Sequence, residues 1–95
     1  MIIEHANVPT GNASRYLQQL CKHWSHKLQV EFTEEEGTVR FETATARMGA
    51  APAYLRVQLE AEDDATIERL KKVMAEHLDR FAFREAPLRF DWTKA

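Results

Sequence analysis

The chain of 95 residues contains only one cysteine, Cys21, together with three glycines and three prolines. A lone thiol cannot form an internal disulfide, which is typical of a protein that folds in a reducing compartment. Three glycines are too few for the glycine-rich loops that bind phosphate. No apolar run approaches the roughly 20 residues of a membrane span, and Met1–His5 does not resemble the start of a signal peptide. We therefore expect a cytoplasmic protein without membrane partners.

The sequence also lacks an excess of positive charge. Its 13 Lys and Arg residues stand against 15 Asp and Glu residues, which gives a net charge of −2 and a sequence pI of about 6.1. Proteins that bind nucleic acids generally carry a basic face and a high pI, so nucleic acid is not an expected partner. A chain of this length forms one hydrophobic core, and residues 1–95 are therefore predicted to be a single domain.

Hydrophobic periodicity predicts an α+β fold. Apolar residues alternate with polar ones in the manner of half-buried strands, or recur every three to four residues as in amphipathic helices. The predicted strands are 2–8, 28–33, 38–42, 44–48, 54–60 and 88–92. The predicted helices run from 13 to 26 or 27, and from 64 to an end between 81 and 84. Four consecutive strands with short turns favour an antiparallel sheet with both helices on one face. This two-layer order, β-α-β-β-β-β-α-(β), is similar to one repeat of the TATA-box-binding protein, a likeness of fold alone.

Polar side chains mark the start of each predicted helix. Thr10 or Asn12 is expected to cap the first helix, and Asp63 the second. On the second helix, opposite charges four residues apart are expected to form ion pairs. These pairs are Glu68–Lys72 and Glu76–Arg80.

The segment from Arg15 to Lys27 contains a Cys-x-His-x-x-His pattern that suggests a metal site. Helical geometry divides this pattern, because Cys21 and His23 point about 200° apart around the helix axis. Cys21 belongs to the apolar side of the helix and is predicted to be a core residue rather than a ligand or a nucleophile. His23 and His26 lie about 60° apart and can share a ligand.

His77 has two interpretations that the sequence leaves open. It lies in the apolar stripe of the second helix, which is typical of a core histidine bonded to a backbone carbonyl. It also suits a cleft beside His23, where a neutral imidazole acts as a ligand or a base. A metal site would then consist of His23, His26 and His77, although nothing in the sequence requires a cofactor.

The segment that follows the second helix contains an aromatic residue among charged ones. If the helix continues, Phe83 points away from the apolar stripe and marks a partner surface. We expect instead that the helix ends and that Phe83 packs against the last strand. Basic residues and one carboxylate lie around this segment and around the end of the first helix. The candidate ligand-binding residues are Lys22, His23, His26, Lys27, His77, Arg80, Arg84 and Glu85.

Two segments of the chain resemble a bacterial family, the domain of unknown function 2218. They are Arg15-Tyr16-Leu17 with Leu20–Lys27, and His77–Glu85. The resemblance implies no established activity. Members of the family occur as small stand-alone proteins, and a similar domain is joined to siderophore-interacting reductases. The resemblance therefore implies a link to iron or siderophore metabolism by association.

We expect a non-enzymatic binding or accessory domain. Its partner is predicted to be a small anionic ligand or a siderophore-related protein, bound where the C-terminal ends of the two helices approach each other, since Lys, Arg and His supply complementary charge there. Two alternatives stay open. One is a small metal-dependent enzyme that uses His23, His26 and His77, and the other is a homodimeric structural module that uses an exposed sheet edge.

Overall fold

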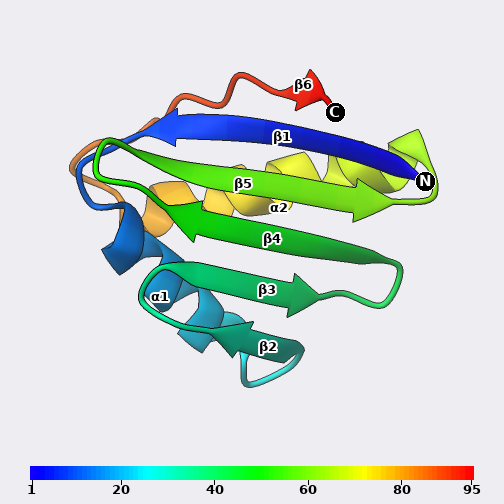
Figure 1. Cartoon of the computed structure of the whole chain (residues 1–95), viewed down its shortest axis with the longest axis horizontal. Helices are drawn as coiled ribbons and strands as arrows, with labels where there is room; N and C mark the ends of the chain where they lie inside the picture. The colour runs from blue at the N-terminus through cyan, green and yellow to red at the C-terminus, as the bar shows by residue number, and fades with distance from the viewer.

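The computed structural model describes residues 1–95 and shows a two-layer α+β domain. Figure 1 shows one sheet in front and two helices behind it. The strands are β1 (Ile2–Pro9), β2 (Gln29–Phe32), β3 (Glu36–Arg40), β4 (Ala44–Ala50), β5 (Tyr54–Ala61) and β6 (Thr93–Lys94), and the helices are α1 (Ala13–Trp24) and α2 (Asp64–Phe81). The predicted fold class and element order are confirmed.

The sheet has the strand order β2-β3-β4-β5-β1-β6, and every neighbouring pair is antiparallel. Helix α1 packs on β2, β3 and β4, whereas α2 packs on β5 and β1. In Figure 1 the start of α1 lies near the end of α2, beside the turn that joins β1 to α1. The topology therefore brings residues 10–19 next to the segment that follows α2, and this contact forms the candidate site.

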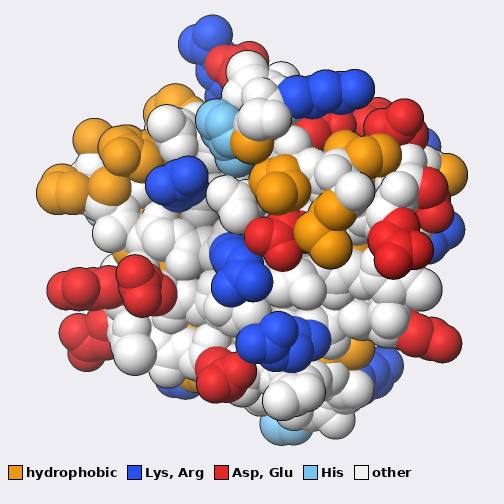
Figure 2. All heavy atoms as spheres, turned by 45° about the vertical axis from the view of Figure 1, so that its right-hand side comes forward, with side chains coloured by type: hydrophobic (Ala, Val, Ile, Leu, Met, Phe, Trp, Pro, Cys, Tyr) orange, Lys and Arg blue, Asp and Glu red, His pale blue; other side chains and the backbone are white.

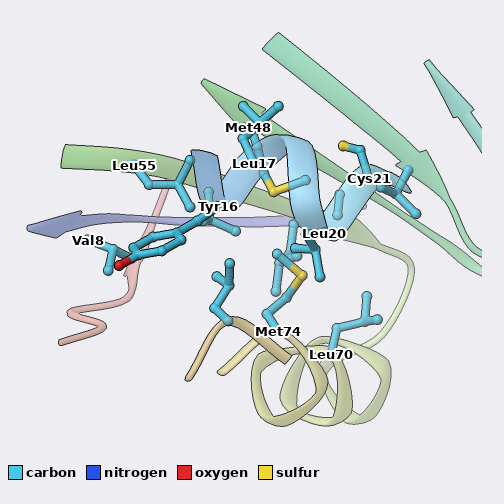
Figure 3. Packing of buried hydrophobic residues seen from close by; sticks show 14 of the residues in the cluster. Val8, Tyr16, Leu17, Leu20, Cys21, Met48, Leu55, Leu70 and Met74 are labelled. Carbon is cyan, nitrogen blue, oxygen red and sulfur yellow. The ribbon is translucent and has the colours of Figure 1, made fainter. Parts of the chain in front are cut away.

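One continuous core fills the space between the helices and the sheet. Figure 3 shows Leu17 and Leu20 of α1, Leu70 and Met74 of α2, and Met48 of β4 gathered in this core. The apolar stripes of both helices lie where the periodicity predicts them, because a two-layer domain can bury only one side of each helix.

Cys21 is a core residue, as predicted. Its side chain is fully buried, and burial raises the pKa of the thiol to about 11. A Cβ atom added to Gly37 would lie 2.7 Å from Cys21 Sγ. Glycine at position 37 therefore permits the close approach of α1 to β3, and Cys21 is not available as a reactive thiolate.

Helix α1 ends at Trp24, earlier than the predicted end at His26 or Lys27. Lys27 and Leu28 both donate backbone hydrogen bonds to the Trp24 carbonyl, at 3.0 and 2.8 Å, and turn the chain into β2. His26 therefore lies in a turn outside the helix. The angular relation that placed it beside His23 does not apply.

The two predicted helix caps have different outcomes. Asp63 caps α2, since its side chain accepts a hydrogen bond of 2.7 Å from the Thr66 backbone N–H. Asn12 occupies the cap position of α1 but its side chain makes no cap hydrogen bond. The Thr10 and Asn12 side chains point instead to a residue beyond α2, as described below.

The predicted ion pairs Glu68–Lys72 and Glu76–Arg80 are replaced by a network around Lys71. Its ammonium group lies 2.8 Å from Glu4 and 2.7 Å from Glu68. Glu4 is on the inward side of β1 and only 5% exposed. A buried carboxylate needs a cation or several donors, and Lys71 is the α2 residue that reaches it.

The predicted strand at 88–92 is wrong, because only Thr93 and Lys94 pair with β1. Leu88 is buried, and its N–H donates to the Asp79 side chain at 2.8 Å. Phe90 and Trp92 stack with ring centres 5.8 Å apart. This segment packs as an irregular chain across the edge of the core, where burial of alternate residues does not require strand pairing.

Candidate ligand-binding site

The centre of the site is the Glu85 carboxylate, which ties the segment after α2 to the start of α1. The Thr10 hydroxyl donates to both carboxylate oxygens, at 2.9 and 3.0 Å, and the Asn12 amide donates at 3.2 Å. The Tyr16 hydroxyl donates to the same carboxylate. We call this group of four residues, Thr10, Asn12, Tyr16 and Glu85, the Glu85 latch.

The latch has a defined ionisation state. The hydrogen bond from Tyr16 lowers the pKa of Glu85, with further lowering by Asn12 and Thr10, so the carboxyl group is ionised at neutral pH. The same hydrogen bond raises the pKa of Tyr16, and burial of the phenol acts in the same direction. Tyr16 therefore keeps its proton and donates it, and Glu85 accepts.

Sequence reasoning assigned Glu85 to the site but did not find its partners. Thr10 and Asn12 were expected to cap α1, and Tyr16 was placed on the apolar arc of α1. The Tyr16 ring is indeed in the core and only 5% of the residue is exposed, but Figure 3 shows its oxygen at the edge of the cluster. A buried tyrosine hydroxyl requires a hydrogen-bond partner. The prediction that Tyr16 is buried therefore indicated that a polar side chain lies beside it.

A cavity of about 480 Å³ lies beside the latch, between α1 and the segment after α2. Arg15 and Gln19 of α1 form one side of it, and Phe81, Phe83 and Arg84 form the other. Asn12, Tyr16 and Glu85 of the latch complete the lining.

The two arginines of this cavity have no carboxylate partner. The five ion pairs of the structure include neither Arg15 nor Arg84. The Arg84 guanidinium group lies 5.7 Å from the centre of the Phe83 ring, and Phe83 is 71% exposed. The expectation that Phe83 packs against the last strand is therefore wrong, because the latch holds residue 85 against α1 and leaves Phe83 at the rim of the cavity.

A pair of histidines lies next to this cavity. The rings of His23 and His77 have centres 5.4 Å apart, and Phe81 contacts His23 with centres 6.0 Å apart. His77 Nδ1 is 2.7 Å from the Val73 carbonyl oxygen, and the Trp24 ring is 5.0 Å away. The two interpretations of His77 thus combine. It bonds to a backbone carbonyl, and it is only half-buried and faces His23.

The candidate residues from the sequence fall into two neighbouring groups and a scattered remainder. His23 and His77 lie together, whereas Arg84 and Glu85 lie with the beginning of α1 because the helices run in opposite directions. His26 makes no ring contact with either histidine, and no three His, Cys, Asp or Glu side chains are grouped to hold a metal ion. The remaining candidates are exposed and form no ion pair; they are Lys22, Lys27 and Arg80.

A larger cavity of about 570 Å³ lies at the other end of the sheet, and its lining is predominantly acidic. Glu60 pairs with Arg47 at 3.3 Å, and Asp63 caps α2. In Figure 2 acidic and basic side chains are interspersed over the face turned to the viewer. Glu42 and Glu62 also line this cavity, and Arg69 is its single basic side chain, so it lacks the pair of arginines found beside the latch.

Comparison with known proteins identifies the family. A family model described as an uncharacterised protein conserved in bacteria, the domain of unknown function 2218, matches residues 5–93. The chain belongs to this family. The matched region includes all four residues of the Glu85 latch and both histidines of the pair.

A solved structure gives the same fold for a second protein of similar sequence. The NMR structure of PA4090 from Pseudomonas aeruginosa has 33% sequence identity and a TM-score of 0.84, and the match covers 98% of this chain and 96% of that one. No curated protein matches the chain. Neither helix has the length and apolar character to cross a membrane. The family description names no activity, so the function is inferred from the cavity.

Proposed function

We propose that this domain is a non-catalytic binding module for a small anionic ligand, held in the cavity beside the Glu85 latch. The observation that carries the proposal is the pair of unpartnered arginines, Arg15 and Arg84, at a cavity of about 480 Å³. Guanidinium groups in proteins commonly pair with carboxylates, and they bind free carboxylates through two parallel hydrogen bonds.

The lining of the cavity favours a ligand with both a carboxylate and an aromatic or other apolar part. Phe81 and Phe83 offer ring surface on one side, and Gln19 offers an amide on the other. The Glu85 carboxylate repels an anion that approaches it, since it is ionised and already accepts three donors. The anionic group of the ligand is therefore directed to the two arginines and the apolar part to the phenylalanines.

The chemistry of the available groups supports binding rather than catalysis. Glu85 is a weak base because its pKa is lowered and its oxygens are engaged. Tyr16 has a raised pKa and directs its proton to Glu85. Ser14 Oγ donates to the Glu34 carbonyl oxygen at 2.6 Å, and Cys21 is in the core. None of these groups has the paired base or lowered pKa of an activated nucleophile.

The proposed link to siderophore metabolism suggests which anionic ligands to test. Catechol carboxylates are aromatic anions of a size that suits the cavity, and their ferric complexes are also anionic. A panel that contains benzoate, 2,3-dihydroxybenzoate and citrate, each with and without ferric ion, separates three preferences. These are for an aromatic acid, for a catechol, and for negative charge alone.

Thermal-shift and calorimetric titrations with this panel test the proposal. We expect an aromatic carboxylate to raise the melting temperature, because a ligand of the native state stabilises it. Arg84→Gln and Arg15→Gln are each expected to weaken binding by about tenfold or more, since a hydrogen bond to a charged group contributes about 1.5–3 kcal/mol.

Arg56→Gln is the matched control, because Arg56 is exposed and belongs to β5 in the sheet, away from the cavity-lining residues. Its affinity is expected to stay within twofold of the wild-type value. The proposal would be wrong if no member of the panel bound. It would also be wrong if Arg56→Gln weakened binding as much as Arg84→Gln.

A further inference from the structure

We infer that His23 and His77 form a two-imidazole binding site for a divalent first-row transition-metal ion such as Cu²⁺ or Zn²⁺. The two rings come from different helices and have centres 5.4 Å apart. This site is separate from the proposed carboxylate site, which uses Arg15 and Arg84, and neither requires the other.

The hydrogen bond of His77 prepares one ring nitrogen to coordinate a metal. Because a carbonyl oxygen can only accept, the 2.7 Å contact with Val73 places the imidazole proton on His77 Nδ1. The lone pair of a neutral ring is then on Nε2. Metal-binding histidines in proteins usually donate their second N–H to a carbonyl or a carboxylate in this way, which fixes the tautomer and the ring orientation.

The separation of the rings suits a shared metal ion. Two imidazoles that bind one Zn²⁺ at about 2.0–2.1 Å per Zn–N bond, with near-tetrahedral geometry, have ring centres about 5 Å apart. The observed separation of 5.4 Å is close to this value, and rotation of the His23 ring about its side-chain bonds can turn a nitrogen toward His77. His23 is exposed and can rotate, whereas His77 is half-buried and held by Val73 and Trp24.

The chain supplies two ligands and not a third. No third His, Cys, Asp or Glu side chain is grouped with this pair. A bound ion would therefore complete its coordination with water, and its affinity would be lower than that of a structural site with four protein ligands. Among divalent ions of this row, imidazole sites bind Cu²⁺ most tightly.

The neighbouring tryptophan provides a local readout. The Trp24 ring is 5.0 Å from the His77 ring, and Cu²⁺ quenches the fluorescence of an indole at such short range. The other tryptophan, Trp92, lies in the C-terminal segment beside Lys71. A Trp92→Phe background leaves Trp24 as the only indole, and titration with CuCl₂ then reports binding at the histidine pair.

We expect saturable quenching with a stoichiometry of one, reversed when EDTA removes the Cu²⁺. His23→Ala is expected to weaken binding by tenfold or more without unfolding the protein, because His23 is exposed. His26→Ala, a matched control on the exposed turn after α1, is expected to change the affinity by less than twofold.

Three results would overturn the inference. They are quenching that does not saturate, quenching that saturates at a stoichiometry other than one, and an equal loss of affinity in His23→Ala and His26→Ala. Because Arg84→Gln leaves the imidazoles in place, its Cu²⁺ affinity is expected to match that of the wild type. The metal titration and the carboxylate titration can therefore fail independently.

Discussion

Two carboxylates connect distant parts of the chain, and they are stabilised in different ways. Glu4 connects β1 to α2, and Glu85 connects the segment after α2 to the β1–α1 region. Glu4 is only 5% exposed and has a single strong partner, the Lys71 ammonium group at 2.8 Å. Glu85 belongs to an exposed segment, and three neutral donors from the β1–α1 region converge on it. The first is a buried ion pair and the second is an anion held by hydroxyl and amide groups.

The difference shows why only one of the two regions is a candidate site. At Glu4 the nearby cation already has partners within the protein. The Lys71 ammonium group also contacts Glu68 at 2.7 Å and lies 5.7 Å from the Trp92 ring centre. At Glu85 the carboxylate is stabilised without a cation, so the nearby Arg15 and Arg84 keep their charge for a ligand. Neutral donors at the latch thus leave the arginines free.

The largest expected effect comes from Lys71→Met, which leaves Glu4 buried without its cation. Burial alone lowers the pKa of Lys71, but the hydrogen bonds and charges of Glu4 and Glu68 outweigh it and raise the pKa. Removing one partner of a buried ion pair typically costs about 3–5 kcal/mol. Because Lys71 is partly exposed, we expect a loss near the lower limit, about 3 kcal/mol, in urea denaturation.

The double variant Glu4→Leu with Lys71→Met separates the cost of an unpaired charge from the value of the pair. Replacement of both partners by apolar residues is expected to recover most of the lost stability. If the double variant were as unstable as Lys71→Met alone, packing rather than the unpaired charge would account for the loss. Glu4 would then not need a cation, and it would not differ from Glu85 in this respect.

Glu85→Gln is expected to have a smaller effect on stability and a larger one on binding. The amide keeps one acceptor oxygen but places an NH₂ group among three donors. A loss of about 1–2 kcal/mol in urea denaturation is expected, because hydrogen bonds to a charged group are involved and the site is exposed to solvent. The affinity for a carboxylate ligand should fall by about tenfold, since the loss of a fixed position for residues 83 and 84 outweighs the removal of the repulsion between Glu85 and the ligand.

Tyr16→Phe is the control for this prediction. It keeps the buried ring and removes a single donor, so its loss should be about 1 kcal/mol, with a weaker effect on binding than that of Glu85→Gln. A Glu85→Gln protein with unchanged carboxylate affinity would show that the latch does not position the arginines.

The parts of the fold that were predicted correctly depend on local patterns. The apolar side of α1, including Leu17, Leu20 and Cys21, follows from helical periodicity and is buried as expected. The strand at 88–92 was wrong because Leu88, Phe90 and Trp92 also alternate, but pack irregularly over the edge of the core. Periodicity identifies which side chains are buried better than it identifies the hydrogen-bond partners of the backbone.

The site was predicted only in part for a different physical reason. The donors of the latch lie 69 to 75 residues from Glu85 in sequence, and no local pattern links them. The sequence context of Thr10 and Asn12 already suggested a local role as helix caps. It gave no indication that their side chains bond to Glu85. The closeness of His23 and His77 was one of two interpretations that the sequence left open, and His26 was misplaced because α1 ends at Trp24.

The smallest expected effect is the dependence of the latch on pH. Its direction follows from the lowered pKa of Glu85 in the folded protein, caused first by the Tyr16 hydrogen bond. A carboxyl group with a depressed folded-state pKa binds more protons when unfolded. Its contribution is therefore fully present above the unfolded pKa of about 4.3 and is lost as the pH falls through the lower folded value.

Urea denaturation of the wild type and Glu85→Gln between pH 6 and pH 3 measures this contribution as the difference between the two curves. The stability difference is expected to be constant near pH 6 and to shrink as the pH falls below about 4.3, since only the wild type carries the titrating group. Other carboxylates titrate in both proteins and cancel. A difference that stayed constant to pH 3 would mean that the latch does not depend on the charge of Glu85, and that uncharged hydrogen bonds alone distinguish it from the Glu4–Lys71 pair.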